Sequence, residues 1–552
     1  MKHLFWIAAV ATAMISCQQH HDMSEGPRPT KNVILMVPDG TCTGVLALSK
    51  WYKHYCGEED FELNVSDHVC GLMSSTMSNG ILSCSAAAMS TIMTGMPQRP
   101  GNVSIYPAPD PERDIIEVDE SRSYQPLMTV MEASSIMKGR STGAVVTVEF
   151  HHATPAACAA HTPSRGDRKA IARQIASNGV DVVFGGGLDA MDEVTREILA
   201  ENGVTLIEKD INAFREYDGD GGVWALFEEG EMAYDLDRDP SSAPSLAEMT
   251  AKAIEVLSKD KDGFFLMVEG SKMDYAGHAN ESNALITEFL AFDKAVGVAM
   301  DFAKKDGNTT VIVVPDHGNS SITAGKYGYK GYTNKGIDSI YVGMKNYKAT
   351  YQKLAKILEN KKTAEIRPIF REWTGIDLKD KELQSLKDAA GKKESDYMQV
   401  ANSVNFESAI AKILSSHTNI GFASSGHTSE DVFLAIYHPK GDIPHGILTN
   451  TEVNEYLCAV SGIETSLDEM SEKYFRRHDK LFEGYEYEII PSKDAPVLKV
   501  KSGNNEIILE AWKAKVSVNG ETHRLQTPSV YIKKNNSFYV SDEVIHLLRS
   551  LN

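Results

Sequence analysis

Several short runs of β-branched and other apolar residues recur along the chain, and helical patterns separate them. The runs are VILMV (33–37), AVVTV (144–148), VDVVF (180–184), FFLMV (264–268) and TVIVV (310–314). Strands that are almost continuously apolar are typical of parallel sheets whose two faces are both covered. Apolar residues at helical spacing in 246–260 and 285–304 would supply part of that cover. The sequence therefore predicts an α/β fold with a mostly parallel central sheet and helices on both faces.

The composition and the spacing of apolar residues change at two places along the chain. A length of 552 residues exceeds one ordinary domain. Residues 325–415 are polar and Lys-rich, which indicates a partly helical insertion in a main domain spanning 32–487. From about Glu488 the pattern has period-2 alternation, an Asn519-Gly520 hairpin signal and a closing helical segment. We expect a small β-rich, stalk-like domain over 488–552.

The N-terminus carries an export signal. Lys2 precedes an apolar run from Leu4 to Ile15, which is too short to span a bilayer but fits the core of a signal peptide. Met14-Ile15-Ser16-Cys17 resembles a bacterial lipobox, in which the cysteine becomes the lipid-bearing N-terminus. We predict a lipoprotein signal peptide over 1–17, a tether over 18–31, and an exported protein anchored through Cys17 in the periplasm or on the cell surface. An ordinary signal peptide is the alternative.

The net charge bears on which ligands the protein can bind, and the cysteines bear on which disulfides it can form. A formal net charge of −20 argues against nucleic-acid binding, because little would neutralise phosphate backbones. It does not argue against a small anion held by metal ions. Export would permit disulfides. Cys56 and Cys70 are the first pair to consider, although spacing alone leaves the connectivity open.

Polar side chains follow four of the predicted strands at the point where each ends. They are Asp39, the group His151, His152 and Thr154, then Glu269, and finally Asp316 with His317. Ligands of open parallel sheets bind beyond the carboxyl ends of the strands. Any one of these residues could be part of a turn, but four strands ending in oxygen or imidazole donors predict a metal centre.

Further residues fit the same centre. Asp274 and His278 are four positions apart, so on a helix they share a face, and His427 could add a second imidazole. Imidazole with carboxylate suits zinc, and carboxylate with hydroxyl suits magnesium. Ser85 precedes a helical pattern, where a hydroxyl lies near the positive end of the helix dipole. The fork of Arg165 matches two phosphate oxygens.

Taken together, these segments resemble the alkaline phosphatase family of metal-dependent phosphomonoesterases. The matching segments keep the order of the family and cover about residues 30–450. They are KNVILMVPDG, CSAAAMSTIMTG, HATPAACAAHTPSR, MVEGSKMDYAGHANE, VVPDHG and SSGHTSEDV.

The resemblance implies a role for each residue. It implies two Zn²⁺ ions and one Mg²⁺ ion, a Ser85 nucleophile that forms a phosphoserine intermediate, and an Arg165 that binds the phosphate of small phosphomonoester substrates. The implied ligands of the first zinc, the second zinc and the magnesium are, in that order, Asp274, His278 and His427; Asp39, Asp316 and His317; and Asp39, Thr154 and Glu269. A homodimer is the commonest closed assembly and is a further expectation.

The sequence departs from the family at four positions near these residues, one of which is Pro38, where a glycine is more usual before Asp39. Cys84 stands where many relatives have an aspartate that orients the arginine, which could weaken phosphate binding. His152 and Tyr275 also differ from some relatives and could alter magnesium affinity or the pH optimum.

Two other functions remain open at this point. A phosphodiesterase or nucleotide pyrophosphatase could use the same two-zinc scaffold, although Thr154, Glu269 and Arg165 favour a monoester. A non-catalytic surface binding protein is suggested by Cys84 and the extra domain.

Overall fold

The structure is a computed structural model, and it describes residues 26–394, 396–492 and 495–550. The predicted signal peptide, the predicted lipid attachment at Cys17 and most of the predicted tether lie outside the described residues, so these assignments stay predictions. Within the described ranges, no helix combines the length and the apolar character needed to cross a membrane.

The centre of the described chain is a sheet of ten strands. Its order is β14-β2-β13-β8-β1-β7-β3-β4-β6-β5. The bounds in chain order are β1 (Asn32–Pro38), β2 (Val69–Ser74), β3 (Ser141–Glu149), β4 (Val182–Gly186), β5 (Thr205–Glu208), β6 (Val223–Leu226), β7 (Phe264–Gly270), β8 (Thr309–Val313), β13 (Val432–Tyr437) and β14 (Gly446–Thr449). Every neighbouring pair is parallel except the two pairs that contain β13. The predicted mostly parallel sheet is confirmed.

Strand β1 shows why its apolar residues are continuous. Ile34 and Met36 pack into one hydrophobic cluster, and the alternating Val33, Leu35 and Val37 pack into a second one. Successive side chains of a strand point to opposite faces, so a strand that is apolar at every position is buried on both. The sheet therefore separates two cores.

Helices cover both faces, as predicted. Residues of α1 (Gly44–Cys56), α8 (Leu246–Leu257) and α10 (Ser282–Asp306) contribute to the first core. Residues of α2 (Ser85–Thr94), α3 (Val130–Lys138), α4 (Ala153–Ala159), α5 (Arg168–Ser177) and α16 (Asn450–Ser461) contribute to the second. The predicted helical segments 246–260 and 285–304 correspond to α8 and α10.

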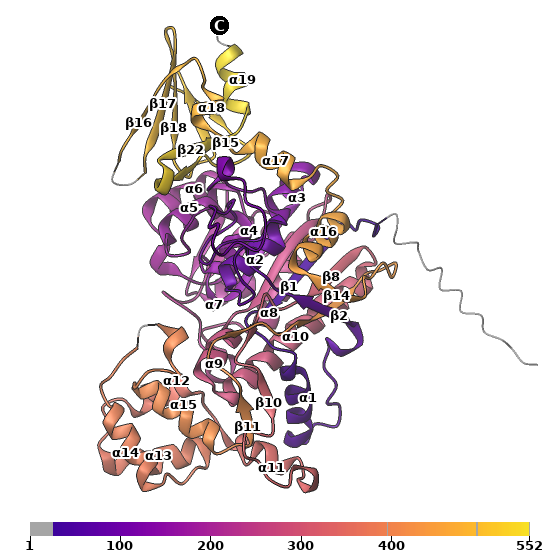
Figure 1. The fold of residues 1–552 in the computed structure, drawn as a ribbon, viewed down its shortest axis with the longest axis vertical. Coiled ribbons are helices and arrows are strands. Elements are labelled where there is room, and N and C mark those ends of the chain that lie inside the picture. Colours follow the sequence, from indigo (N-terminus) through magenta and orange to yellow (C-terminus); the bar gives the residue numbers. More distant parts are fainter. Residues whose placement is uncertain (1–25, 395, 493–494, 551–552) are drawn as a thin grey trace, which may run out of the picture.

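The polar segment 325–415 is largely helical. Its longer helices are α12 (Tyr351–Leu358), α13 (Thr363–Thr374), α14 (Asp380–Ala389) and α15 (Phe406–Ser416). A short 3₁₀ turn, η8 (Tyr397–Gln399), precedes α15. Figure 1 shows these helices at the opposite end of the molecule from the C-terminal strands.

The C-terminal segment has a core of its own. The antiparallel strands β16 (Glu486–Ile490), β17 (Val497–Ser502), β18 (Asn505–Glu510), β19 (Lys515–Val518) and β20 (Glu521–Arg524) form one sheet. Leu498, Ile507 and Val516 of this sheet pack with Val544 and Leu548 of the closing helix α19 (Glu543–Ser550). The predicted β-rich C-terminal segment is confirmed, and its apolar cluster also includes Leu481 and Phe482.

The suggested Cys56–Cys70 disulfide is wrong. Both residues are free thiols in the structure, with Cys56 exposed and Cys70 half-buried. Cys70 lies in β2, inside the large sheet, whereas Cys56 ends α1. The two cysteines are close in sequence but do not form a disulfide.

Candidate active site

The carboxyl ends of neighbouring strands bring the predicted donors to one edge of the sheet. Asp39 follows β1, Glu269 is the penultimate residue of β7, and Asp316 with His317 follows β8. The register pairs Val37 with Glu269 and Pro38 with Gly270, so Asp39 leaves β1 two residues beyond the level of Glu269. All four side chains are buried.

One group of possible metal ligands comes from a helix and a distant short strand. Helix α9 (Lys272–Ala279) carries Asp274 and His278 on one face, and His427 begins β12 (His427–Thr428). Their ligand atoms lie within 4.8 Å of one another. The Nε2 atoms of the two histidines are 3.1 Å apart, and Asp274 Oδ2 lies 3.5 Å from His278 Nε2.

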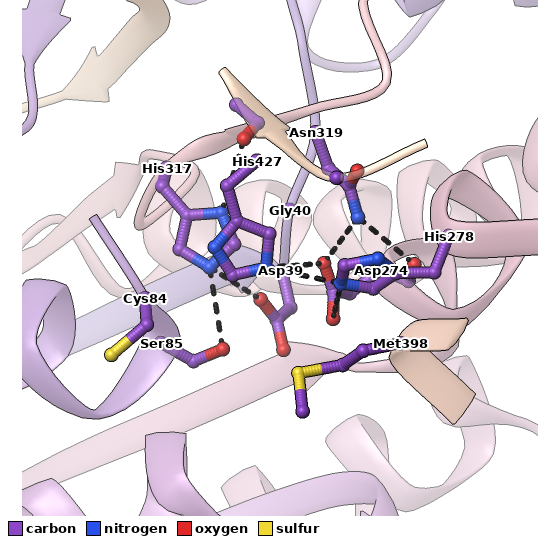
Figure 2. Close-up of polar contacts among 12 residues, drawn as sticks. Asp39, Gly40, Cys84, Ser85, Asp274, His278, His317, Asn319, Met398 and His427 are labelled. Atoms are coloured by element: carbon purple, nitrogen blue, oxygen red, sulfur yellow. Dashed lines mark hydrogen bonds and ion pairs between the residues drawn. The ribbon is translucent and has the colours of Figure 1, made fainter. Parts of the chain in front are cut away.

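A second group lies directly beside the first. Asp39, Asp316 and His317 also bring their ligand atoms within 4.8 Å. His317 Nε2 is 3.4 Å from Asp316 Oδ2 and 3.7 Å from Asp39 Oδ1. The rings of His317 and His427 stack at 3.9 Å, which joins the two groups, as Figure 2 shows.

A third group shares Asp39 and adds Glu269 and His152. The sequence placed Thr154 with Asp39 and Glu269, and treated His152 as a neighbour. Thr154 is fully buried in α4, and its Oγ1 has no hydrogen-bond partner. The structure thus gathers carboxylates and imidazole here, with a free hydroxyl on an adjoining helix.

The donor set fits positive ions. Buried oxygens without hydrogen-bond partners include Asp39 Oδ1 and Oδ2, Glu269 Oε1 and Oε2, Asp274 Oδ2, Asp316 Oδ2 and Thr154 Oγ1. Buried polar atoms are almost always paired, because an unpaired one costs free energy. Cations would satisfy all of these atoms at once and would offset the repulsion among four buried carboxylates.

Burial shifts the titration of the same residues. Burial, and then the charge of Asp316, raises the pKa of Glu269 to about 8 and that of Asp39 well above its ordinary value. Burial also raises the pKa of Asp316 to about 6 and lowers the pKa values of His317 and His427 to about 4. The imidazoles are therefore neutral near pH 7, which is the form that binds metals.

Ser85 faces this centre from the first turn of α2, a helix whose ten residues are all buried. Its Oγ lies 3.3 Å from His317 Nε2, so the hydroxyl reaches the second ligand group. The preceding Cys84 caps the helix without a side-chain hydrogen bond, and Figure 2 shows its sulfur turned away from the ligands.

Arg165 approaches from a loop beyond α4. Its Nη2 lies 2.7 Å from His152 Nε2 and donates to the hydroxyl of Tyr397 at 3.4 Å. Burial lowers the pKa of His152 well below its ordinary value, so this partner is neutral. Within the described part of the chain, no carboxylate forms an ion pair with Arg165.

Tyr275, the third predicted neighbour, is buried in α9. Its ring packs against Tyr397 with 3.8 Å between centroids and 11° between planes. All predicted site residues except His151 thus lie in or beside one cluster. His151 instead contacts Asp189 at 3.3 Å.

Sequence reasoning missed three residues of this site. Asn319 donates to Asp274 Oδ1 at 2.7 Å, and the Gly40 N–H donates to Asp316 Oδ1 at 3.1 Å. Gly40 has φ of 58°, and a Cβ there would come within 2.2 Å of Asp274 Oδ1, so only glycine fits. Asn319 directly follows the segment VVPDHG and Gly40 ends the segment KNVILMVPDG, so both could have been found. Tyr397 lies in the insertion, and no local pattern marks it.

Comparison with known proteins gives consistent results. A family model described as alkaline phosphatase matches residues 30–463. Alkaline phosphatase 4 of Bacillus subtilis is 30% identical over 436 residues, which cover 76% of this chain and 87% of that protein. Alkaline phosphatase 3 of the same organism is 33% identical over 335 residues, covering 59% of this chain and 68% of that protein.

Solved structures extend the match to the fold. The cold-active alkaline phosphatase of a Shewanella species superposes with a TM-score of 0.66 at 26% identity, covering 78% of this chain and 99% of that one. The Thermus thermophilus alkaline phosphatase shares the fold with a TM-score of 0.67 at 21% identity, covering 82% and 96%. The chain belongs to the alkaline phosphatase family and is an enzyme that hydrolyses phosphate monoesters.

Proposed function

We propose that the three ligand groups hold two Zn²⁺ ions and one Mg²⁺ ion, and that Ser85 is the nucleophile of a two-step hydrolysis. The observation that carries the proposal is the convergence of four buried carboxylates with unpaired oxygens beside His317, which the Ser85 hydroxyl contacts at 3.3 Å; the carboxylates are Asp39, Glu269, Asp274 and Asp316.

The chemistry of each group suits a particular ion. Asp274, His278 and His427, and likewise Asp39, Asp316 and His317, offer the imidazole and carboxylate donors that zinc prefers. Asp39, Glu269 and Thr154 offer oxygens, which suit magnesium. When bound, the ions supply Lewis acidity that favours an ionised hydroxyl and offsets charge on the phosphate and leaving oxygens.

Ser85 and Arg165 have different roles in the reaction. Ser85 Oγ attacks phosphorus, the bond to the leaving alcohol breaks, and a phosphoserine forms; water afterwards releases inorganic phosphate and restores Ser85. Arg165 binds phosphate oxygens through its planar fork. Phosphoryl transfer depends mainly on such positioning and charge compensation. Burial of the cluster excludes bulk water and strengthens these interactions.

The test compares p-nitrophenyl phosphate with bis-p-nitrophenyl phosphate at alkaline pH, with zinc and magnesium added. We expect a monoester rate far above the diester rate. A diester preference would place the protein among phosphodiesterases.

A trapping experiment tests the intermediate. Enzyme quenched in acid during turnover of ³²P-labelled substrate should carry label on the Ser85 peptide, and Ser85→Ala should carry none and lose roughly 10³-fold or more in kcat. The neighbouring Ser83→Ala is the matched control. Full labelling of Ser85→Ala would rule out the serine as nucleophile.

A further inference from the structure

We propose that Tyr397, which the insertion delivers to the site, is a positioning residue that holds the Arg165 guanidinium in the orientation for binding phosphate. The inference rests on the proposed role of Arg165. It assigns to the insertion a function in the chemistry of the site.

The surroundings of Arg165 create the need for such a residue. Among the described residues no carboxylate pairs with the guanidinium, and its side-chain contacts are with His152 and Tyr397. An arginine side chain loses considerable rotamer entropy when it is fixed, so an unsupported fork would spend much of its time out of place. His152 supports Nη2 at 2.7 Å.

Tyr397 contacts the same nitrogen. Its hydroxyl accepts a hydrogen bond from Nη2 at 3.4 Å. Its ring also lies 6.1 Å from the His152 ring, so tyrosine, histidine and guanidinium form one contiguous group. Neither support is a carboxylate, so the guanidinium gains contacts without an acidic partner that would neutralise the charge a phosphate meets.

The tyrosine is itself held in place by the core. Its ring stacks on Tyr275 of α9 and meets the His278 ring edge-on at 5.7 Å. The following segment is pinned too, since the Ala401 N–H donates to the His278 carbonyl at 3.3 Å. The η8 turn is therefore anchored on the helix that carries two of the metal-ligand candidates. Through this turn the insertion contributes Tyr397 to the surroundings of Arg165.

The experiment uses Tyr397→Phe in the metal-replete enzyme. Phenylalanine keeps the stack on Tyr275 and removes only the hydroxyl. We expect the inhibition constant of inorganic phosphate and the KM for p-nitrophenyl phosphate to rise about 3- to 10-fold, with kcat changed less than about twofold, because a bond to a charged group is lost.

Tyr347→Phe is the matched control. Tyr347 is buried in the same insertion and its hydroxyl also bonds at 3.4 Å, but to the Leu414 carbonyl. A merely structural effect would appear in both variants as a lower melting temperature. The expected split between phosphate affinity and kcat should appear only in Tyr397→Phe.

A double-mutant cycle with Arg165→Ala shows whether the tyrosine acts through the arginine. We expect Tyr397→Phe to have no further effect on phosphate inhibition once Arg165 is absent. An unchanged inhibition constant in Tyr397→Phe, or an equal loss in both backgrounds, overturns this inference alone, provided that Arg165→Ala weakens phosphate binding. If Arg165→Ala leaves phosphate binding intact, the proposed function of Arg165 fails, and the inference fails with it.

Discussion

The two sides of the site are built in different ways. On the metal side, most of the donors stand at the ends of central strands or on α9, and their neighbours are buried core residues. On the arginine side, Arg165 comes from a loop, Tyr397 from the insertion, and the contact between them is 3.4 Å. The metal side is fixed by the sheet, whereas the arginine side depends on segments outside it.

This difference indicates where the fold tolerates change. A ligand at a strand end cannot move without disturbing the sheet, so its chemistry depends on its own atoms. An arginine on a loop can be supported by an acid, an imidazole or a phenol from several directions. We therefore expect large, all-or-none effects on the metal side and graded effects on the arginine side.

Among the changes that compare the two sides, the largest effect should follow Asp316→Asn. The amide can still accept from the N–H groups of Gly40 and His317, but it loses the charge that a cation requires. We expect about 100-fold or greater loss of activity and the loss of one metal equivalent, measured by plasma mass spectrometry. Asp293→Asn is the control, because Asp293 is also buried and also accepts from two backbone N–H groups. Equal metal content in Asp316→Asn and the wild type would contradict the assignment.

The next effect is a pH dependence of the metal-free protein. Folding raises the pKa of Glu269 from 4.5 to about 8, so the folded state binds a proton that the unfolded chain releases, and stability falls as pH rises through that window. His317 and His427, lowered from 6.5 to about 4, have the opposite effect, but only below pH 6.5.

The free energy of unfolding of the metal-free protein should therefore fall between pH 6.5 and 8, on the order of 2 kcal/mol for Glu269 alone. Calorimetry of metal-free and metal-loaded protein measures it as a difference. The buried Glu281 and Glu288, each raised to about 7, contribute to both forms and cancel. A difference that is constant from pH 6.5 to 8 would contradict the model of a repelling carboxylate cluster.

On the arginine side, Cys84→Asp should act by a smaller factor. A carboxylate next to the nucleophile gives Arg165 a charged support, which we expect to improve the inhibition constant of phosphate about 2- to 5-fold. The gain should be larger in the Tyr397→Phe background, where the phenol is missing. Cys84→Asn, which offers no charge, is the control, and an equal gain in both variants would argue against an ion pair.

The smallest effect on catalysis should follow Leu498→Ala. Leu498 is fully buried in the separate C-terminal core, so we expect about 2–5 kcal/mol of destabilisation there. A cavity of about 820 Å³ lies between that unit and the loop after Arg165, lined by Gly166, Asp167, Trp512 and Tyr531 among others. Phosphate inhibition should change less than about twofold and metal content should not change. A larger change in phosphate inhibition would show that the C-terminal unit influences the position of Arg165.

Much of this architecture could be predicted from the sequence. Strands such as β1 and β7 are short and have an unbroken apolar run, and a carboxylate directly follows β1 and directly follows the apolar run of β7. Their parallel order brings those donors to one edge regardless of the connecting segments. Most of the metal side could therefore be predicted from local patterns and from the common edge at which parallel strands end.

The arginine side was not predictable in the same way. Tyr397 is one of several tyrosines in a polar insertion, and its position depends on how η8 packs on α9. One ligand on the metal side also depends on packing: strand β13 runs against its neighbours, so His427 reaches the same edge by preceding a strand rather than following one. Such placements depend on tertiary packing, which sequence spacing does not encode.

The short ladder between β9 (Gly318–Asn319) and β12 has a consequence for how the site is assembled. It pairs Asn319 with His427, and the whole insertion forms the loop between them. Closing a loop of about 100 residues carries an entropic cost of a few kcal/mol. A cation shared by α9 and His427 would hold that loop shut. The cysteines in the described part of the chain are all free. Metal ions can therefore serve as the crosslinks of this enzyme, and a nascent chain gains its complete site only after residue 427 has been made.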